Sequence, residues 1–381
     1  MLEIDWQWWL TKLTDPQAYV RQVSAFLNIR FLIFYVSVAV AIQLLFLFSF
    51  LRRRRREAEG HAWSGLVSRD RMSMGIKRAI RYLAPPEVIS RKSFVVDVQF
   101  WLLACLGITS LIAKALAFIF LLDQVPVVFS YLGLENNSAV KVIRSSVSEL
   151  DETGRLLVVF LVAFVSYDLA SYWAHRLVHT KFLWEFHKVH HYPGQINVLA
   201  GHRFHPIDSL VQYAVTGVCT ATAVTIVAPL DSSNFYSSYS PYLDQRAWWY
   251  ASFVFYGAYF GRLVHSHFPI YFGKFFGKLL VSPAFHMIHH SKIIANHNFG
   301  GMFAIWDYLF GTHHDVSSLK DYDYHVEHLG VPDMPDEAYT NVIQAMYRPF
   351  VDAWRVLMQF LRRSVHREPP KAKTEAADQA T

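Results

Sequence analysis

The sequence contains only two cysteines and few charged residues. Cys105 and Cys219 both lie within apolar runs, which excludes a disulfide scaffold and is typical of small buried residues. Charged residues make up 17% of the 381 residues, against about 25% in ordinary globular proteins. Hydrophobic residues make up 53% and aromatic residues 16%, so intrinsic disorder is excluded for the bulk of the chain. The length would allow two or three soluble domains, but this composition argues against them.

Long apolar runs indicate a membrane protein. Residues 31–51 carry no charge over 21 positions, enough to cross a hydrocarbon core of about 30 Å as a retained helix. Further crossings are predicted at about 97–122, 156–174 and 209–230. A shorter fifth segment, 247–261, either lies partly outside the bilayer or forms a re-entrant hairpin with the fourth. We therefore expect an all-α fold of multi-pass membrane helices.

The placement of basic residues predicts the orientation of these helices. Residues 52–95 contain twelve Lys and Arg against four Asp and Glu, so this loop is expected in the cytoplasm. Because each crossing moves the chain to the opposite side of the membrane, loop 123–153 is expected outside. Residues 175–206 and everything after the fifth segment are then expected in the cytoplasm. The arginine run 52–56 could also bind nucleic acid. Its position directly behind an apolar helix argues against that, and no nucleic-acid partner is expected.

The C-terminal part is predicted to form an amphipathic helix and a tail. Between residues 334 and 365, apolar residues recur at steps of three and four, and Pro349 is expected to bend or split the helix. This helix either lies on the membrane surface or covers the cytoplasmic domain. Residues 367–381 are polar and are predicted to be disordered. The predicted organisation is an anchor with a basic loop at 1–95, a membrane domain at 96–330, the amphipathic helix at 331–366 and the tail at 367–381.

Histidines are concentrated in one part of the chain. There are 19, and all but His61 and His366 lie between residues 175 and 328. They form one HxxxH motif and two HxxHH motifs, whose spacings place imidazoles on one face of a helix. The motif residues are His175 and His179, then His187, His190 and His191, then His286, His289 and His290; His265 and His267 follow the fifth apolar segment.

These motifs predict a metal centre with two ions. They all follow apolar segments on the predicted cytoplasmic side, so eight to ten imidazoles can converge in one layer. This exceeds the ligand number of one tetrahedral ion and indicates two ions, each with four or five nitrogen ligands. A zinc peptidase would need HExxH, but Arg176 follows the first histidine. Two alternatives stay open, a metal transporter and a non-catalytic membrane scaffold, although a transporter would hold ligands near the bilayer midplane.

The motifs and their surroundings resemble the membrane-bound fatty acid hydroxylase superfamily, which includes sterol desaturases, sterol methyl oxidases, alkylglycerol monooxygenases and lipid hydroxylases. The resemblance covers roughly residues 168–312. Besides the histidine motifs it includes the segments Asp168-Leu-Ala-Ser-Tyr-Trp-Ala-His175, Arg203-Phe-His-Pro206, His265-Ser-His267, Asn298-Phe-Gly300 and Trp306-Asp-Tyr-Leu-Phe-Gly-Thr312. Residues 1–150 match only as generic membrane helices.

The resemblance implies a catalytic domain with a cytoplasm-facing pair of non-haem iron ions that activates O2 against an unactivated C–H bond of a lipid. The eight motif histidines and His265 carry over as nine ligands. Some members have a further His or Asn four residues before His265, where this chain has Gly261. A tenth ligand would then be His267, or else His202 or His205. Zinc in the same cage is the alternative metal.

Three polar residues are expected to support the ligands from behind. Asp168 lies seven residues before His175, on the same face of the predicted helix, and is the main candidate for a catalytic-site carboxylate that orients this ring. Asn298 and Asp307 are further candidates, and His202 and His205 would act in the same way if they are not ligands.

The reaction would need electrons and a lipid from outside the chain. There is no GxGxxG after a strand and no His-Pro-Gly-Gly motif of a fused cytochrome b-type domain, so a separate donor is expected. It would be a cytochrome b-type or ferredoxin-like protein with its reductase, docked on the basic loop 69–92. The substrate could be a fatty acyl chain, a sterol, an alkylglycerol or an amino-acid lipid, and hydroxylation, desaturation and ether cleavage all stay open. The membrane would be the bacterial inner membrane or the endoplasmic reticulum.

Overall fold

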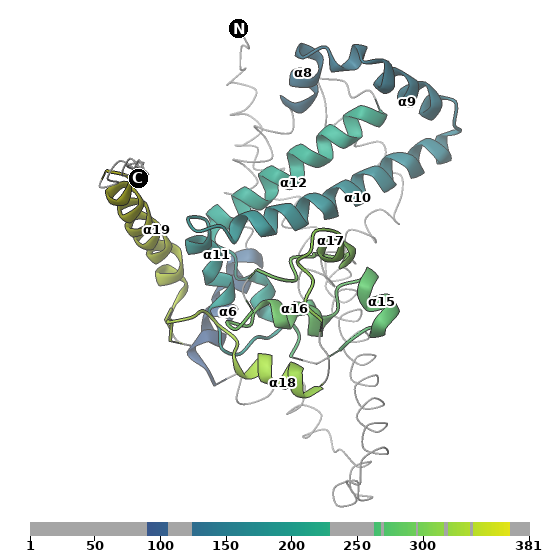
Figure 1. The fold of residues 1–381 in the computed structure, drawn as a ribbon. Coiled ribbons are helices and arrows are strands. Elements are labelled where there is room, and N and C mark those ends of the chain that lie inside the picture. The colour runs from purple at the N-terminus through teal and green to yellow at the C-terminus, as the bar shows by residue number, and fades with distance from the viewer. Residues whose placement is uncertain are drawn as a thin grey trace, which may run out of the picture.

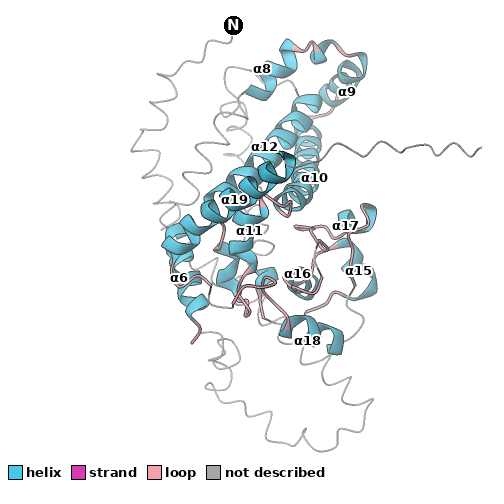
Figure 2. Cartoon of the chain, turned by 60° about the vertical axis from the view of Figure 1, so that its left-hand side comes forward, coloured by secondary structure: helices cyan, strands magenta, loops and turns pink. Residues whose placement is uncertain are grey.

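The computed structural model describes residues 90–105, 124–228, 263–267, 270–294, 296–315, 319–335 and 338–365. Within these ranges all regular elements are helices, in agreement with the predicted all-α class (Figures 1 and 2). The only extended pairings there are two isolated bridges, Leu280 with Phe303 and Ser291 with Leu329. The predicted segments 31–51 and 247–261, the arginine run, nearly all of the basic loop and the C-terminal tail lie outside the described residues.

Two long apolar helices, α10 (Glu152–Val178) and α12 (Pro206–Val227), pack side by side (Figure 1). The first begins where the Asp151 carboxylate accepts a hydrogen bond from Gly154 N at 2.8 Å. Pro206 opens the second at the first helical position, which its fixed φ favours. Both are long and apolar enough to cross a membrane. They correspond to the predicted crossings 156–174 and 209–230.

The described part of α10 carries an exposed apolar stripe. Leu157, Leu161 and Val165 follow one another at steps of four and are 51%, 48% and 43% exposed. Side chains of this kind, lined up on one helix face, are suited to contact with lipid rather than with water.

The segment expected to be an outer loop, 123–153, is largely helical. It forms α8 (Gln124–Tyr131), a 3-10 turn η2 (Leu134–Asn136) and α9 (Ser138–Ser148), which pack on the end of α12 far from the histidines (Figure 1). Arg144 Nη2 donates to the carbonyl of Thr225 at 2.7 Å and ties α9 to α12. The sequence analysis did not predict these helices, because the polar composition of α9 hides its helical periodicity; the side of the membrane on which the segment lies stays a prediction.

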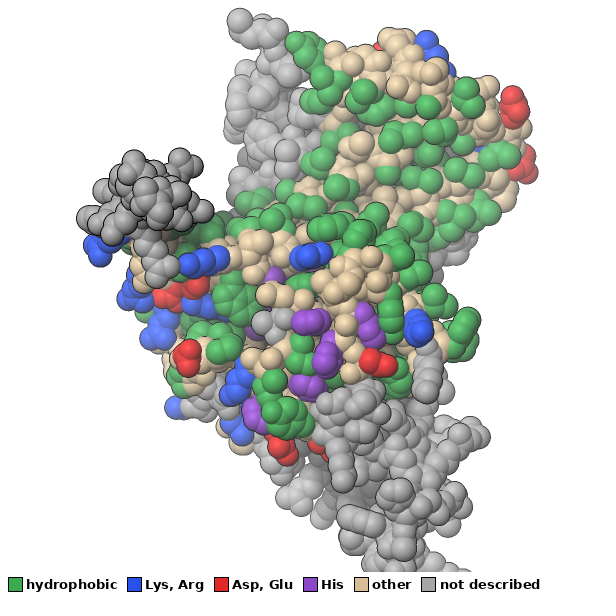
Figure 3. Space-filling model, in the orientation of Figure 1, with side chains coloured by type: hydrophobic (Ala, Val, Ile, Leu, Met, Phe, Trp, Pro, Cys, Tyr) green, Lys and Arg blue, Asp and Glu red, His purple; other side chains and the backbone are tan. Residues whose placement is uncertain are grey.

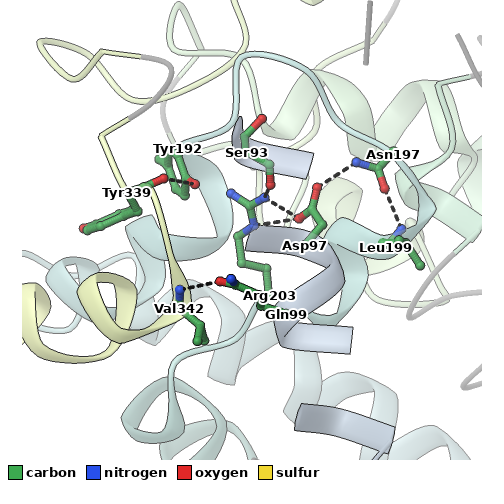
Figure 4. Close-up of polar contacts among 9 residues, drawn as sticks. All are labelled: Ser93, Asp97, Gln99, Tyr192, Asn197, Leu199, Arg203, Tyr339 and Val342. Carbon is green, nitrogen blue, oxygen red and sulfur yellow. Dashed lines mark hydrogen bonds and ion pairs between the residues drawn. The ribbon is translucent and has the colours of Figure 1, made fainter. Parts of the chain in front are cut away.

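A buried polar network joins α6 (Lys92–Cys105) to the η3 turn (Val198–His202) (Figure 4). Arg203 Nε donates to Asp97 Oδ1 at 2.7 Å, and Asn197 Nδ2 donates to Asp97 Oδ2 at 2.7 Å. Arg203 also donates to the carbonyl of Ser93 at 2.6 Å, and its guanidinium lies over the Tyr192 ring. Asp97 therefore belongs to a packed polar core, whereas the sequence assigned it to the second membrane crossing. The part of that crossing beyond residue 105 lies outside the described residues.

The C-terminal helix α19 (Val342–Val365) packs against α11 (Trp184–His191) and α6. Its N-terminal turn is fixed where Val342 N donates to Gln99 Oε1 at 2.8 Å (Figure 4). The helix continues through Pro349, so the predicted split does not occur, and it begins eight residues later than the pattern suggested. The remaining short helices are α15 (Gly273–Leu279), α16 (Pro283–His289), α17 (Ile305–Leu309) and α18 (Leu319–Glu327), with the 3-10 turn η4 (Leu263–His265).

Candidate metal centre

Nine histidine side chains converge in two neighbouring groups at one end of the α10–α12 pair. Within each group the candidate ligand atoms all lie within 4.8 Å of one another. The five-histidine group contains His175, His179, His187, His191 and His289, and the four-histidine group contains His190, His265, His286 and His290. The contributing elements are the C-terminal end of α10, α11, η4 and α16 with its C-cap.

Helix geometry explains why the histidines divide between two groups. Adjacent residues on an α-helix point about 100° apart, so neighbouring imidazoles cannot aim at one point. His190 and His191 accordingly belong to different groups, and so do His289 and His290. Each HxxHH motif thus contributes to both groups, which holds the two groups side by side.

The distances between ring nitrogens in the four-histidine group are those expected for ligands of one metal ion, and hydrogen bonds alone do not account for them. The Nε2 atom of His265 lies 3.0 Å from His190 Nε2 and 2.9 Å from His286 Nε2, and the latter lies 3.2 Å from His290 Nε2. A ring nitrogen carries either one hydrogen or one lone pair, so a row of four nitrogens cannot be satisfied by hydrogen bonds alone. Two nitrogens bound to one ion at 2.0–2.1 Å would lie about 2.9–3.4 Å apart, depending on the coordination angle.

The five-histidine group has the same character. His187 Nε2 lies 3.1 Å from His191 Nε2. His179 Nε2 and His289 Nε2 are buried and have no hydrogen-bond partner in the described part of the chain. Buried nitrogens without partners are costly unless something binds them. Both groups therefore fit metal ions with imidazole ligands.

Burial keeps six of the nine imidazoles neutral. It lowers the pKa of each far below 6.5, and the neighbouring imidazoles lower it further, because a charge on one ring disfavours a charge on the next. The affected residues are His179, His190, His191, His286, His289 and His290. Neutral imidazole is the form that binds metal ions, so the centre is ready for a cation at neutral pH.

Three histidines of the five-histidine group are oriented through Nδ1. His187 Nδ1 donates to Asp208 Oδ2 at 2.9 Å, and Gln212 Nε2 donates to the other carboxylate oxygen at 2.7 Å. His175 Nδ1 lies 2.9 Å from the carbonyl of Phe299, and His289 Nδ1 lies 2.7 Å from the carbonyl of His297. A donating Nδ1–H leaves the lone pair on Nε2, which faces the centre of the group.

Asp208 was missed by the sequence analysis. It is fully buried in the first turn of α12, two residues after Pro206. The available signal was a carboxylate at the end of an apolar run, which is the same signal that selected Asp168.

Asp168 has a different position from the one expected. Its carboxylate accepts hydrogen bonds from Met302 N at 2.9 Å, Phe303 N at 3.1 Å and Trp306 Nε1 at 2.8 Å. Seven residues along a helix correspond to a rise of about 10.5 Å, so sharing a face with His175 does not bring the two side chains together. Asp168 instead fixes the segment that follows Phe299 to α10.

Asp307 and Asn298 hold the loop that carries the Phe299 carbonyl. Asp307 accepts from Phe299 N and Gly300 N, both at 2.8 Å, and from Thr312 Oγ1 at 2.7 Å. Burial raises the pKa of Asp307 to about 6, against the lowering effect of these hydrogen bonds. Asn298 adopts φ 59°, and its Oδ1 accepts from His314 N at 2.8 Å. Both residues therefore support His175 through the backbone.

The remaining predicted residues lie outside both groups. His205 Nδ1 accepts from Ile207 N at 3.1 Å and its Nε2 lies 2.9 Å from the carbonyl of Met346, so this ring caps α12 and bonds to α19. Its two ring nitrogens are thus used within the fold rather than in a ligand group. His202 lies in η3, and neither it nor His267, the candidate tenth ligand, is in a group.

Comparison with known proteins agrees with this site. Residues 160–312, which contain all nine histidines, match the fatty acid hydroxylase family. This segment is thus similar to the fatty acid hydroxylase family, in agreement with the resemblance of its motifs. It is 30% identical over 151 residues to an ornithine lipid hydroxylase of Rhizobium tropici, a stretch that covers 39% of each chain. It is 29% identical over 163 residues to a Delta(7)-sterol 5(6)-desaturase of Aspergillus fumigatus, covering 41% of this chain and 49% of the relative. The matches thus span less than half of these relatives, and no solved structure matches.

Proposed function

We propose that this chain is a membrane-bound, O2-dependent lipid hydroxylase or desaturase with a two-iron centre. The observation that carries the proposal is the convergence of nine histidines, seven of them buried, in adjacent groups of five and four, within the segment that matches the fatty acid hydroxylase family. Two iron ions bound there would supply the oxidising power against a C–H bond that side chains lack. The five-histidine group would hold one ion and the four-histidine group the other.

The protein's own residues prepare this centre. Asp208 and the carbonyls of Phe299 and His297 hold Nδ1–H of three rings, so that the Nε2 lone pairs stay directed inward. The neighbouring imidazoles are buried, which excludes water that would protonate them or react with an oxidant. Thiolates would themselves be oxidised, and the only described cysteine side chain, Cys219, is on α12 away from both groups.

The position of the centre favours a lipid substrate. The nine histidines lie at one end of the two apolar helices, and α10 carries its exposed leucine and valine stripe farther along the same helix. Figure 3 shows hydrophobic side chains over α10 and α12 and histidines on the face below them. Both relatives, an ornithine lipid hydroxylase and a sterol desaturase, are named as lipid-acting enzymes. We propose that a lipid chain reaches the centre from the bilayer, on the cytoplasmic side predicted from the basic residues.

The electrons would come from a separate donor. We propose a cytochrome b-type or ferredoxin-like protein with its reductase, docked on the basic loop 69–92, of which only residues 90–92 are described. Charge reversal at Arg78 and Arg81 should then slow reduction by the donor without changing metal content. Unchanged reduction kinetics would remove this docking site.

One experiment tests the proposed function as a whole. The full-length protein is produced in cells, and the lipids are compared by mass spectrometry with those of cells that lack it. A gain of one oxygen or a loss of two hydrogens in one lipid class is expected, together with O2 consumption in membranes supplied with reductant. The His190→Ala variant should abolish both, whereas His328→Ala, whose ring lies outside both groups and contacts the Tyr324 carbonyl, should not. Metal transport without O2 consumption would instead identify a transporter.

A further inference from the structure

Helix α19 is fixed to the protein by one face only. Ala345 and Ala353 are buried there, and the Phe350 ring contacts the rings of Phe186 at 5.3 Å and His205 at 5.2 Å. Lys188 on α11 donates to Asp352 at 2.9 Å. This face explains why α19 stays beside α11 in both ribbon views (Figures 1 and 2).

A second face of α19 is apolar and exposed. Ile343 is 70% exposed and Trp354 is 61% exposed. Successive members are three, four or seven residues apart, so they form one stripe along the helix. The stripe consists of Ile343, Tyr347, Val351, Trp354 and Leu361. A contiguous apolar surface of this kind marks an interaction site.

Arginines follow one edge of this stripe. Arg348, Arg355 and Arg362 recur every seven residues, so they form a line along the helix, about 100° round from the centre of the stripe. Arg348 Nη1 donates to the carbonyl of Ala338 and Arg355 Nη1 donates to Asp352, but each guanidinium has further donors. The helix contains four arginines and one aspartate, a net charge of +3.

Further exposed apolar side chains lie at the C-terminal end of α10 and in the turn that follows it. Phe186 also contacts the ring of Phe182, at 6.1 Å, and Phe182 is itself exposed in the turn between α10 and α11. Trp173 and Leu177, in the last turns of α10, are exposed as well. In Figure 3, basic side chains gather over the part of the surface that α19 occupies. These exposed side chains belong to the end of a helix long and apolar enough to span a membrane.

We propose that α19 lies in the interface of an anionic bilayer, with the stripe among the acyl chains and the arginines at the lipid phosphates. Aromatic side chains and arginines suit this position, since both have an apolar part and a polar end. A second copy of this chain is the less suitable occupant. In a two-fold dimer the same surface would meet itself, which would bring two helices of charge +3 together. Anionic lipid has the complementary charge.

The test uses the full-length protein in lipid nanodiscs. Cys105 and Cys219 are replaced by serine, and one cysteine carrying the fluorophore NBD is introduced as Trp354→Cys or as Gln359→Cys. Residue 354 lies in the stripe, whereas residue 359 is exposed on the far side of the arginine line and serves as the matched control. NBD emission is measured with nitroxide-labelled lipid and with aqueous iodide, in phosphatidylcholine with and without phosphatidylglycerol.

We expect NBD at position 354 to be quenched by nitroxide lipid and protected from iodide, more so with phosphatidylglycerol, and NBD at 359 to show the opposite. Replacing Arg355 and Arg362 by glutamine should remove the effect of phosphatidylglycerol. Equal access of iodide to both positions would overturn the proposal. Protection of position 354 without quenching by nitroxide lipid would also overturn it, because another part of a protein would then cover the stripe.

Discussion

The Asp208→Ala variant should lose one of the two metal ions. Asp208 accepts the Nδ1–H of His187 at 2.9 Å, and the side chains of both residues are almost completely buried. Without the carboxylate, the ring can rotate or shift its proton to Nε2, which removes the lone pair that faces the five-histidine group. Carboxylates that orient metal-binding histidines typically contribute about 10- to 100-fold in metal affinity. We therefore expect a loss of that size at the five-histidine group alone.

Asparagine at position 208 should have the smaller effect. Its amide oxygen can still accept from His187, but the negative charge is lost, and its NH2 group would face the donor of Gln212. We expect about a tenfold loss for Asp208→Asn, near the lower end of the range for such partners. Gln212→Ala is the matched control, because it removes the second bond to Asp208 and leaves the bond to His187 in place.

The assay is a titration of the purified variants with a competing chelator, followed by elemental analysis of the retained metal. The four-histidine group should keep its ion in every variant, since within the described residues Asp208 bonds to His187 and Gln212 and not to a member of that group. Thermal unfolding of the metal-free forms separates loss of affinity from loss of fold. Two ions held as tightly in Asp208→Ala as in the wild type would refute the reasoning.

Three further predictions concern stability. The metal-free protein should be less stable at pH 5.5 than at pH 7.5. Burial keeps the pKa of six histidines far below 6.5 in the folded protein, so below this pH the unfolded chain binds more protons than the folded one. The free energy of unfolding then falls by up to about 1.4 kcal/mol per pH unit for each histidine. A stability that rises on acidification would contradict it. Asp97→Ala should cost about 3–5 kcal/mol in urea unfolding by leaving Arg203 buried without its carboxylate, whereas Asp97→Leu combined with Arg203→Met should recover most of this loss. Gly300→Ala should lower both the melting temperature and activity, because a Cβ would lie 2.7 Å from the Phe303 carbonyl oxygen; a wild-type melting curve would show that the loop adjusts freely.

The sequence predicted the histidine groups better than their supports. Motif spacing places imidazoles on helix faces, and the structure brings together the same nine residues that the spacing and the family resemblance selected. His267 could not be excluded in this way, because residues in a short turn have no helical periodicity to fix their direction. That the nine bind iron is still a prediction.

The supporting residues depend on contacts between distant segments. Asp168 was chosen because it shares a helix face with His175, but its partners come from residues 302–306, far along the chain. The Phe299 carbonyl that does bond to His175 leaves no trace in the sequence, since every residue has a carbonyl. Asp97 likewise needed Arg203, more than a hundred residues away, before its place in a buried network could be recognised.

The membrane helices were predicted to different degrees. In the described part of the chain, two predicted crossings correspond to α10 and α12. Both helices are long and apolar enough to span a membrane. The number of further crossings and the face on which the centre lies are still predictions. Helix α9 was missed because short amphipathic helices with many polar residues resemble loops in a hydropathy profile.

The central claim is that nine imidazoles bind a pair of iron ions. It is tested most directly by elemental analysis and X-ray absorption of the full-length protein purified without chelators. We predict two iron ions per chain, each surrounded mainly by nitrogen atoms at about 2.0–2.2 Å, and loss of one ion in His179→Ala and of the other in His290→Ala. A wild-type protein that binds fewer than two ions, or variants that retain both, would contradict the account.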